Sequence, residues 1–337
     1  MTRTGKIDRT FFGEFIASRL GAAREDVTRG PAYGVDFGVV DTGEQALVVA
    51  TDPLSLLPAL GFARAGRFAI RFALADVAVS GLPPTHVALS FSLPPSMDDE
   101  QFEEVWTAID EECRDLGVAV VTGHTARYEG VSFPWVGAGT AFALGDHDDV
   151  VYPDGATPGD ELLVTKGPAV ETTGLLTTLF PDQIDLPEET LDVAQNRLED
   201  TEVVRDALAV SDAASVSAMH DATEGGLLGA FFEMAHSASV RLVVDSDAIP
   251  VMPGVEETTR ALDMDPWRAG TGGTLVLSVP PEEVDDVVDA LERRGTPVGI
   301  AGRVEEGSGV VLDGETQEPP EGDSSWPVYE RLLSHSD

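Results

Sequence analysis

Segments with the patterns of strands and helices alternate along this chain, and the alternation occurs twice. In the first half, the strand "QALVVATD" (45–52), the helix "AGRFAIRFALADVAVSGL" (65–82) and the strand "PTHVALSFSL" (84–93) follow one another. A second helix, "DDEQFEEVWTAIDEECRDLG" (98–117), leads to the strands "VAVVTGHT" and "VGAGTAFALG". Alternation of this kind predicts sheets covered by helices, so we expect a fold that combines α and β elements.

A turn-rich segment, "HDDVVYPDGATPGD" (147–160), separates the two halves, and "ELLVTKG" then begins a new strand. A chain of 337 residues is long enough for two domains with separate cores. We place the N-terminal domain at 1–148, the C-terminal α/β domain at 155–310 and a tail at 311–337. Further helices are expected at 8–20, 168–181, 187–210 and 281–294.

The chain carries 60 acidic and 21 basic residues, a formal net charge of -39, and its only lysines are Lys6 and Lys166. An apolar content of 42% still supports a folded core. A strongly acidic surface repels polyanions, which argues against nucleic-acid binding. The excess of acids and the scarcity of lysine predict a halophilic, archaeal source organism.

The sequence shows no pattern of a membrane anchor or a signal peptide. The N-terminal stretch "MTRTGKIDRTFFGEFI" lacks an apolar core, and no window reaches about 20 apolar residues. We therefore expect no membrane association and a cytoplasmic location. The one cysteine, Cys113, lies in a helical pattern and is expected to be a small buried residue and not a nucleophile.

The stretch "SAMHDATEGGLLGAF" (217–231) allows two interpretations. In the first, Asp221 or Thr223 is the N-cap of a helix, and Glu224 stabilises its first turn. The second is a ligand site, because two consecutive glycines cost about 1 kcal/mol each inside a helix and instead let backbone N–H groups approach an anion. Asp221 would then hold the cation that accompanies a phosphate.

Three acids of the first half also suggest a site. Asp36 lies in the Gly-rich turn "GPAYGVDFGVV", and Asp52 ends the strand in "VVATDPLS". Turn chemistry explains both of these acids as well as a function does. Asp76 stands among small and apolar residues in the helix "FALADVAVSG", where an acid must be solvated, paired or bound to a cation. Three carboxylates suit Mg²⁺, which often bridges to nucleotide phosphates.

The loop "VTGHTARYEG" follows a strand and offers His124 and Thr125 to a phosphate, although a turn histidine is also common on plain surfaces. The sequence contains no Walker A motif, no Rossmann glycine fingerprint and no Cys/His metal spacing. A P-loop enzyme and a standard dehydrogenase are therefore not supported.

The ordered set of motifs resembles the aminoimidazole ribonucleotide synthetase (PurM) superfamily over residues from about 10 to 305. The motifs are "GPAYGVDFGVV", "ATDPLS", "AGRFAIRFALADVAVSGL", "VVTGHT", "PGDELLVTKG", "MHDATEGG" and "GTPVGIAGRV". The superfamily also includes HypE, selenophosphate synthetase and thiamine-monophosphate kinase. The motifs of this sequence are most similar to those of HypE-type and AIR synthase-related members. The resemblance implies a PurM-like α+β fold, a homodimer whose N-terminal mixed sheets form a barrel, and bound ATP and Mg²⁺. It also implies a small-molecule substrate and, for a hydrogenase maturation factor, a protein partner.

The resemblance assigns roles to individual residues. It implies Mg²⁺ ligands at Asp36, Asp52, Asp76 and Asp221, and catalytic roles for Asp76, His124 and Asp221. The residues that it assigns to nucleotide binding are Gly34, Asp36, Thr51, Asp52, Gly123, Thr125, Lys166, Gly167, Thr223, Gly225 and Gly226.

Several positions depart from the pattern of the superfamily. Ala75 replaces the usual Asn, and His124 stands where many relatives carry Asp or Glu. Glu224 replaces the Arg of the HypE motif, which would weaken contact with a phosphate. The last residues, "YERLLSHSD", lack the cysteine on which HypE-type carbamoyl dehydration depends. Selenophosphate synthetase requires a cysteine near the N-terminal loop, and this sequence has none there.

Two functions follow from these observations. The first is an ATP-dependent enzyme that phosphorylates or activates an oxygen of a small substrate, with Mg²⁺ neutralising charge. The alternative is a nucleotide-binding or regulatory paralogue that keeps the fold without turnover, consistent with Ala75, His124 and the missing cysteine. The sequence does not name the substrate.

Overall fold

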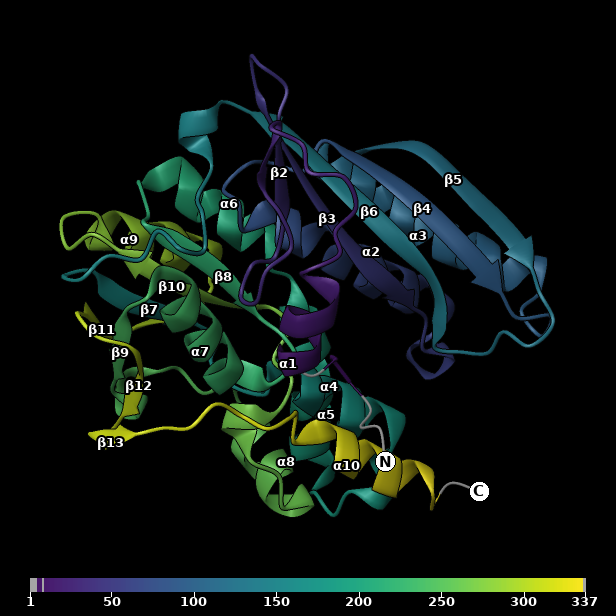
Figure 1. Cartoon of the computed structure of the whole chain (residues 1–337). Helices are drawn as coiled ribbons and strands as arrows, with labels where there is room; N and C mark the ends of the chain where they lie inside the picture. Colours follow the sequence, from purple (N-terminus) through teal and green to yellow (C-terminus); the bar gives the residue numbers. More distant parts are fainter. Residues whose placement is uncertain (1–4, 8, 336–337) are drawn as a thin grey trace. The chain divides into compact units, whose positions relative to one another are not determined.

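The computed structural model describes residues 5–7 and 9–335 (Figure 1). It divides into two compact units. The unit called here the N-unit contains Ala23–Pro31 and Asp36–Val150. The other, called the C-unit, contains Ala32–Val35, the residues from Val151 onward and the described N-terminal residues through Ala22.

A six-stranded sheet forms the centre of the N-unit, in the order β1-β2-β3-β6-β4-β5. Its strands are β1 (Val27–Arg29), β2 (Gly38–Asp41), β3 (Ala46–Ser55), β4 (His86–Leu93), β5 (Ala119–Arg127) and β6 (Trp135–Gly145). Strands β4 and β5 pair parallel and all other neighbours pair antiparallel, so the sheet is mixed. The sheet is open at β1 and at β5, and the expected barrel between two copies remains a proposal.

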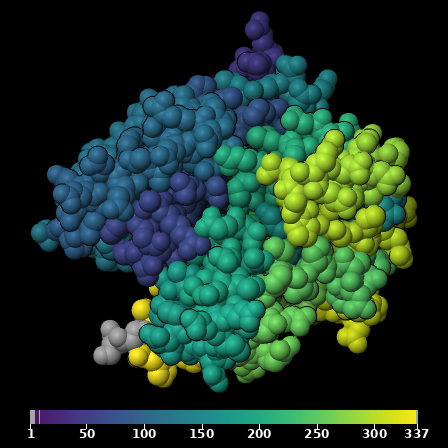
Figure 2. All heavy atoms as spheres, turned by 180° about the vertical axis from the view of Figure 1, so that it is seen from behind, coloured from purple at the N-terminus to yellow at the C-terminus, as the bar shows by residue number. Residues whose placement is uncertain are grey.

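Two long helices, α2 (Phe62–Ala78) and α3 (Asp99–Leu116), pack on the N-unit sheet, and their atoms form its surface when it is seen from behind (Figures 1 and 2). A capping box between Asp98 and Gln101 starts α3. The two helices pack closely at Gly66, where a Cβ would lie 2.6 Å from the Val105 carbonyl oxygen. Both helices were expected from their apolar periodicity, and the structure confirms them.

A seven-stranded mixed sheet forms the centre of the C-unit, in the order β13-β12-β9-β11-β7-β10-β8. Its strands are β7 (Glu161–Thr165), β8 (Ala218–Ala222), β9 (Arg241–Val244), β10 (Thr274–Val279), β11 (Val298–Glu305), β12 (Gly309–Leu312) and β13 (Glu315–Thr316). Its helices are α1 (Arg9–Phe11) with the π-helical turn η1 (Phe12–Ile16), α4 (Val170–Leu179), α5 (Glu188–Gln195), α6 (Val204–Ala213), α7 (Gly226–Ala238), α8 (Val255–Leu262), α9 (Val284–Arg294) and α10 (Ser325–Leu333). Its short 3₁₀ turns are η4 (Pro181–Gln183), η5 (Asn196–Thr201), η6 (Ser246–Ala248) and η7 (Pro266–Arg268), while η2 (Pro58–Leu60) and η3 (His147–Asp149) belong to the N-unit.

The two mixed sheets confirm the mixed α/β class, while some expected elements differ. The helix expected at 187–210 is two helices, α5 and α6, joined by η5. Leu198 of η5 packs on α4, where a Cβ at Gly174 would lie 2.6 Å from the Leu198 nitrogen, and this contact fixes the break. The tail placed at 311–337 contains β13 and α10. Within the described part of the chain, no helix has the length and apolar character to span a bilayer.

Candidate functional site

Asp52 lies inside strand β3, although the sequence predicted it at the end of a strand. Asp52 belongs to a row of residues that crosses the sheet. The row continues through Gly139 of β6 and Leu89 of β4 to Gly123 of β5. Residues opposite one another in neighbouring strands point to the same face of a sheet. Leu54, two positions from Asp52, is fully buried on that face.

Helix α2 brings Asp76 to the same face of the sheet. A Cβ at Gly139 would lie 3.0 Å from the Ala73 Cβ, so α2 packs closely at this point. Asp76 is three residues further along α2 and therefore lies on the same side of the helix. Asp52 and Asp76 are both partly exposed, as is Asp36, which precedes β2. The structure thus places Asp52 and Asp76 on one face of the N-unit sheet, as a shared cation would require.

His124 points to the other face of this sheet. His124 belongs to the row that runs through Ser90 of β4 and Ala138 of β6. Each of these residues is one position along its strand from the row of Asp52, so their side chains point the opposite way. The sequence predicted His124 near the end of the strand "VAVVTGHT" or in the loop after it, and the structure has it inside β5, where its Nε2 is 2.9 Å from the Tyr128 hydroxyl oxygen. Strand β5 continues two residues further than expected, since it pairs with β4 as far as Arg127, whose side chain binds the Met97 carbonyl and the Asp99 carboxylate.

Thr51 also points away from Asp52, since neighbouring residues of a strand alternate between faces. Its hydroxyl is hydrogen-bonded to that of Thr140 on β6. Thr125, by contrast, is opposite Phe91 and shares the helix-covered face. The N-unit therefore separates these residues into two sets, with His124 and Thr51 on the open face and Asp52, Asp76 and Thr125 on the covered one.

Lys166 follows strand β7 of the C-unit and is buried. Its ammonium lies 2.8 Å from an Asp206 carboxylate oxygen and donates to the carbonyls of Gly273 (3.0 Å) and Glu202. An ammonium has three donors, and these partners use all of them. Burial raises the pKa of Asp206, and Lys166 and its other donors lower it by more, so the pKa lies below its ordinary value. Lys166 thus has a complete set of partners inside the C-unit.

Asp221 lies in strand β8, opposite Leu275 of β10, and is buried. Helix α7 begins at Gly226, and its N-cap is Gly225, which provides no side-chain cap. The interpretation of Asp221 or Thr223 as the N-cap is therefore wrong, because pairing with β10 extends the chain at this point. The alternative, a ligand site, stays a prediction.

Each glycine of the pair at the start of α7 has a local structural reason. Gly226 has φ +67°, and a Cβ there would lie 2.6 Å from the Trp267 carbonyl oxygen. Gly225 has φ +88°, a conformation that favours glycine. Its N–H donates to the Asp323 carboxylate at 2.9 Å, so an acid of this chain satisfies the first free donor of the helix.

The sequence did not identify His220 and Glu233 as functional candidates. His220, beside Asp221 in β8, is buried, and its Nε2 lies 2.9 Å from the Glu233 carboxylate of α7. Burial raises the pKa of Glu233, and the His220 hydrogen bond with the charges of Lys6 and Arg9 lowers it by more, so it lies below its ordinary value. The His-Asp pair ahead of the two glycines was the only sequence signal for this arrangement.

Helix α7 also contacts Gly34, which the sequence predicted to bind the nucleotide. The Ser237 hydroxyl donates to the Gly34 carbonyl at 2.8 Å, and Gly34 is buried at φ +73°. A Cβ at Gly34 would lie 2.6 Å from the Glu233 carbonyl oxygen. The close approach of this turn to α7 therefore requires glycine at position 34.

A half-buried carboxyl group lies near Asp323, whose carboxylate binds the N-cap of α7. Glu171 of α4 accepts a hydrogen bond from the Gly272 N–H at 3.0 Å. Burial raises its pKa to about 7, the Gly272 N–H opposes the shift, and the negative charges of Asp323 and Glu224 add to it. The group therefore changes charge near neutral pH.

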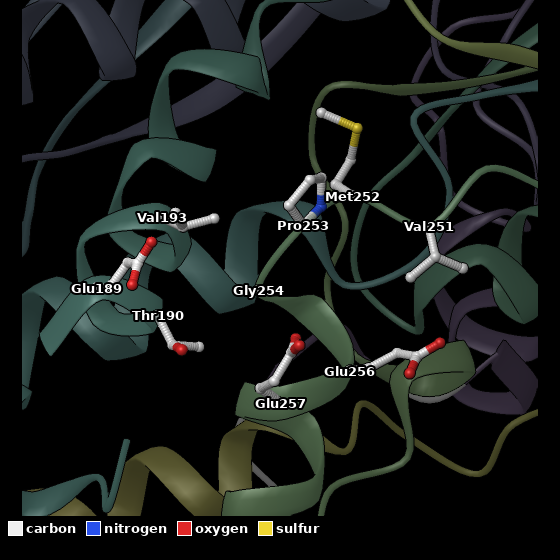
Figure 3. A pocket seen from close by; sticks show the side chains of 9 residues that line it. All are labelled: Glu189, Thr190, Val193, Val251, Met252, Pro253, Gly254, Glu256 and Glu257. Atoms are coloured by element: carbon white, nitrogen blue, oxygen red, sulfur yellow. The ribbon is translucent and has the colours of Figure 1, made fainter. Parts of the chain in front are cut away.

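A cavity of about 360 Å³ lies in the C-unit between α5 and α8 (Figure 3). Three of its lining residues are acids, Glu189, Glu256 and Glu257, and none is a predicted site residue. Three carboxylates disfavour an anionic ligand, so this cavity does not suit a nucleotide.

Two family descriptions match the chain over most of its length. Residues 34–143 match "AIR synthase related protein, N-terminal domain", and residues 157–315 match "AIR synthase related protein, C-terminal domain". The chain belongs to the AIR synthase related family. The resemblance read from the motifs is confirmed.

The relatives of this AIR synthase related protein include enzymes of several activities. The carbamoyl dehydratase HypE of Escherichia coli is 27% identical over 310 residues, covering 90% of this chain and 88% of HypE. The thiamine-monophosphate kinase of Pyrococcus horikoshii is 26% identical over 84% of this chain and 86% of the kinase. A crystal structure of the hydrogenase maturation protein HypE in complex with ATP has a TM-score of 0.68 at 20% identity, covering 94% of this chain and 97% of that one. The last comparison shows the same fold.

Proposed function

We propose that this chain is an ATP-dependent enzyme that phosphorylates or activates an oxygen of a small substrate. The observation that carries the proposal is the placement of acids in a family fold: Asp52 and Asp76 share one face of the N-unit sheet, and Asp221 lies in β8 ahead of the α7 start. A kinase and a dehydratase among the relatives, and a HypE structure that contains ATP, support ATP as the cosubstrate.

Mg²⁺ suits the chemistry of the acids that the family resemblance assigns to it. Asp36, Asp52 and Asp76 offer carboxylate oxygens in the N-unit, and Asp221 offers one in the C-unit. Mg²⁺ prefers oxygen ligands, and partly exposed carboxylates leave room for the waters and phosphates that complete its shell. When bound, Mg²⁺ would neutralise the phosphate charge during transfer. His124 as a catalytic residue, and the nucleotide residues Thr51, Gly123, Thr125, Lys166, Gly167, Thr223, Gly225 and Gly226, remain predictions.

Thiol chemistry of the carbamoyl dehydratase type does not suit the one cysteine of this chain. Cys113 is 3% exposed in α3, and burial together with the charges of Glu112 and Asp110 raises the pKa of its thiol to about 11. The thiol is therefore protonated and covered at neutral pH, which argues against an acceptor role for it. This favours an oxygen of a separate small molecule as the acceptor.

The alternative function, a nucleotide-binding or regulatory paralogue without turnover, is favoured by the position of His124 on the face opposite Asp52. A homodimer through the N-unit, Mg²⁺ dependence, a maturation-type protein partner and a cytoplasmic location belong to the proposal in both cases.

The test is ADP release by the purified protein with ATP, with and without Mg²⁺, in the presence of fractionated small molecules. We expect Mg²⁺-dependent turnover in the wild type, and ATP affinity at least about tenfold lower in Asp76→Asn, because one ligand charge is lost. ATP binding without turnover in any fraction favours the paralogue. Equal affinity in the wild type and Asp76→Asn contradicts the metal assignment.

A further inference from the structure

The two lysines of this acidic chain have opposite environments. Lys166 is buried with a full set of partners, as described above. Lys6 is exposed and lies in the N-terminal segment before α1. The side chain of Lys6 is thus at the surface, whereas that of Lys166 is enclosed.

Glu224, in the turn before α7, holds the N-terminal segment in place. Its Oε1 accepts the Lys6 backbone N–H at 2.8 Å and the Trp326 indole N–H at 3.0 Å. A Cβ at Gly5, which has φ +109°, would lie 1.9 Å from the same oxygen. The sequence of the N-terminal segment therefore allows a close approach to this carboxylate.

This contact places positive charge beside the turn. The Lys6 ammonium lies 3.5 Å from the Thr223 hydroxyl oxygen. Arg9 follows in α1, with its guanidinium 4.2 Å from the Tyr33 ring centre and 3.1 Å from His236 Nδ1. Lys6 thus places one cation beside the turn before α7, and Arg9 lies at the last turn of the same helix, in a protein with a net charge of -39.

We propose that Lys6 contacts the polyphosphate of the nucleotide at the Thr223–Gly226 turn, and that Glu224 is the positioning residue that holds Lys6 there. The proposal rests on the proposed function. A carboxylate at position 224 would by itself repel a phosphate. Because its Oε1 binds the Lys6 backbone, Glu224 instead adds an ammonium to the turn, where HypE-type motifs have an Arg. The positive charge is supplied by the N-terminal segment and not by the turn.

The competing explanation is that Lys6 only compensates the negative charge of Glu233, whose pKa it helps to lower. Dissociation constants for Mg-ATP and for inorganic tripolyphosphate at fixed ionic strength separate the two. We expect Lys6→Met to weaken both ligands about tenfold, since one charge-assisted contact is lost, and Lys6→Arg to stay within about threefold. The control is Arg260→Met, which makes the same change in net charge at an exposed pair with Glu256.

Glu224→Ala gives a result whose sign decides between the explanations. If Glu224 acts through its own charge, its removal strengthens ATP binding, whereas the loss of a positioning residue weakens binding about as much as Lys6→Met. The double variant Lys6→Met/Glu224→Arg places a cation on the turn itself and is expected to recover most of the wild-type affinity. Melting temperatures verify that each variant is folded.

The outcomes separate this inference from the proposed function. A wild type that does not bind Mg-ATP overturns the proposed function, and the Lys6 role with it. A wild type that binds Mg-ATP, with Lys6→Met equal to Arg260→Met or Glu224→Ala tighter than the wild type, overturns the inference alone. Loss of ATP affinity with unchanged tripolyphosphate affinity overturns the assignment of Lys6 to the phosphates.

Discussion

Strands β5 and β8 each form an edge of a sheet and each carry predicted site residues, but their exposure is opposite. All five residues of β8 are buried, including His220 and Asp221, whereas along β5 every residue is exposed except the half-buried Ala126. An exposed edge strand presents unpaired backbone groups and needs a partner or a cover. The polar side chains of β8 are therefore already enclosed within the C-unit, whereas the exposed residues of β5 can be covered by a second molecule.

The largest expected effect lies in the enclosed polar groups of the C-unit. Lys166→Met should lower the free energy of unfolding by about 3–5 kcal/mol, because it leaves Asp206 buried without its ammonium partner. Denaturant unfolding measures this loss. A variant that stays as stable as the wild type but loses ATP affinity would instead place Lys166 in the ligand site.

Glu171 provides a smaller, pH-dependent effect in the same unit. Its folded pKa, about 7, lies above the unfolded value, so the folded state binds the proton more tightly between those values. The contribution of this group is complete below the unfolded pKa and is lost as the pH rises through 7. Glu171→Gln cannot ionise and keeps an acceptor for Gly272.

We therefore expect Glu171→Gln to stabilise the protein by about 1–3 kcal/mol at pH 8 and by little at pH 5. Thermal unfolding at both pH values, in the same buffer salt, provides the measurement. A stability difference that does not change between pH 5 and pH 8 would show that Glu171 is already ionised at pH 5 or is not buried in solution.

Local sequence patterns were sufficient for elements whose apolar residues repeat with one period. Helices α2 and α3 follow from such repeats, and the unusual Asp76 in an apolar helix was identified as a site candidate from sequence alone. Strand β8 was not, because its residues do not alternate between apolar and polar; pairing with β10 makes it a strand. The break after α5 was missed for the same reason, since it depends on a contact with α4.

The environments of the site residues depend on contacts far apart in the sequence. Lys6 and Glu224 are 218 positions apart, and Gly225 and Asp323 are 98 apart. No local pattern predicts such pairs. The sequence named both glycines of the turn correctly as special backbone positions, but their neighbours, Trp267 and Asp323, come from later segments.

The last prediction concerns the open edge of the N-unit. Val121 of β5 is 53% exposed, and we expect it to be covered by a second copy of the chain. Val121→Glu would place like charges at that contact and is expected to raise the dissociation constant of the homodimer at least about tenfold. Val27→Glu is the matched control, because Val27 is 45% exposed on β1, at the opposite edge of the same sheet.

Light scattering over a concentration series in molar KCl measures the dimer, since high salt screens the repulsion between two acidic chains. If Val121→Glu dissociates the dimer and Val27→Glu does not, β5 is the edge that a second copy covers. If only Val27→Glu dissociates it, the contact lies at β1, and the exposure of β5 has another reason. A wild type that is monomeric at micromolar concentration would contradict the homodimer itself, and His124 would then lie on a strand that remains uncovered.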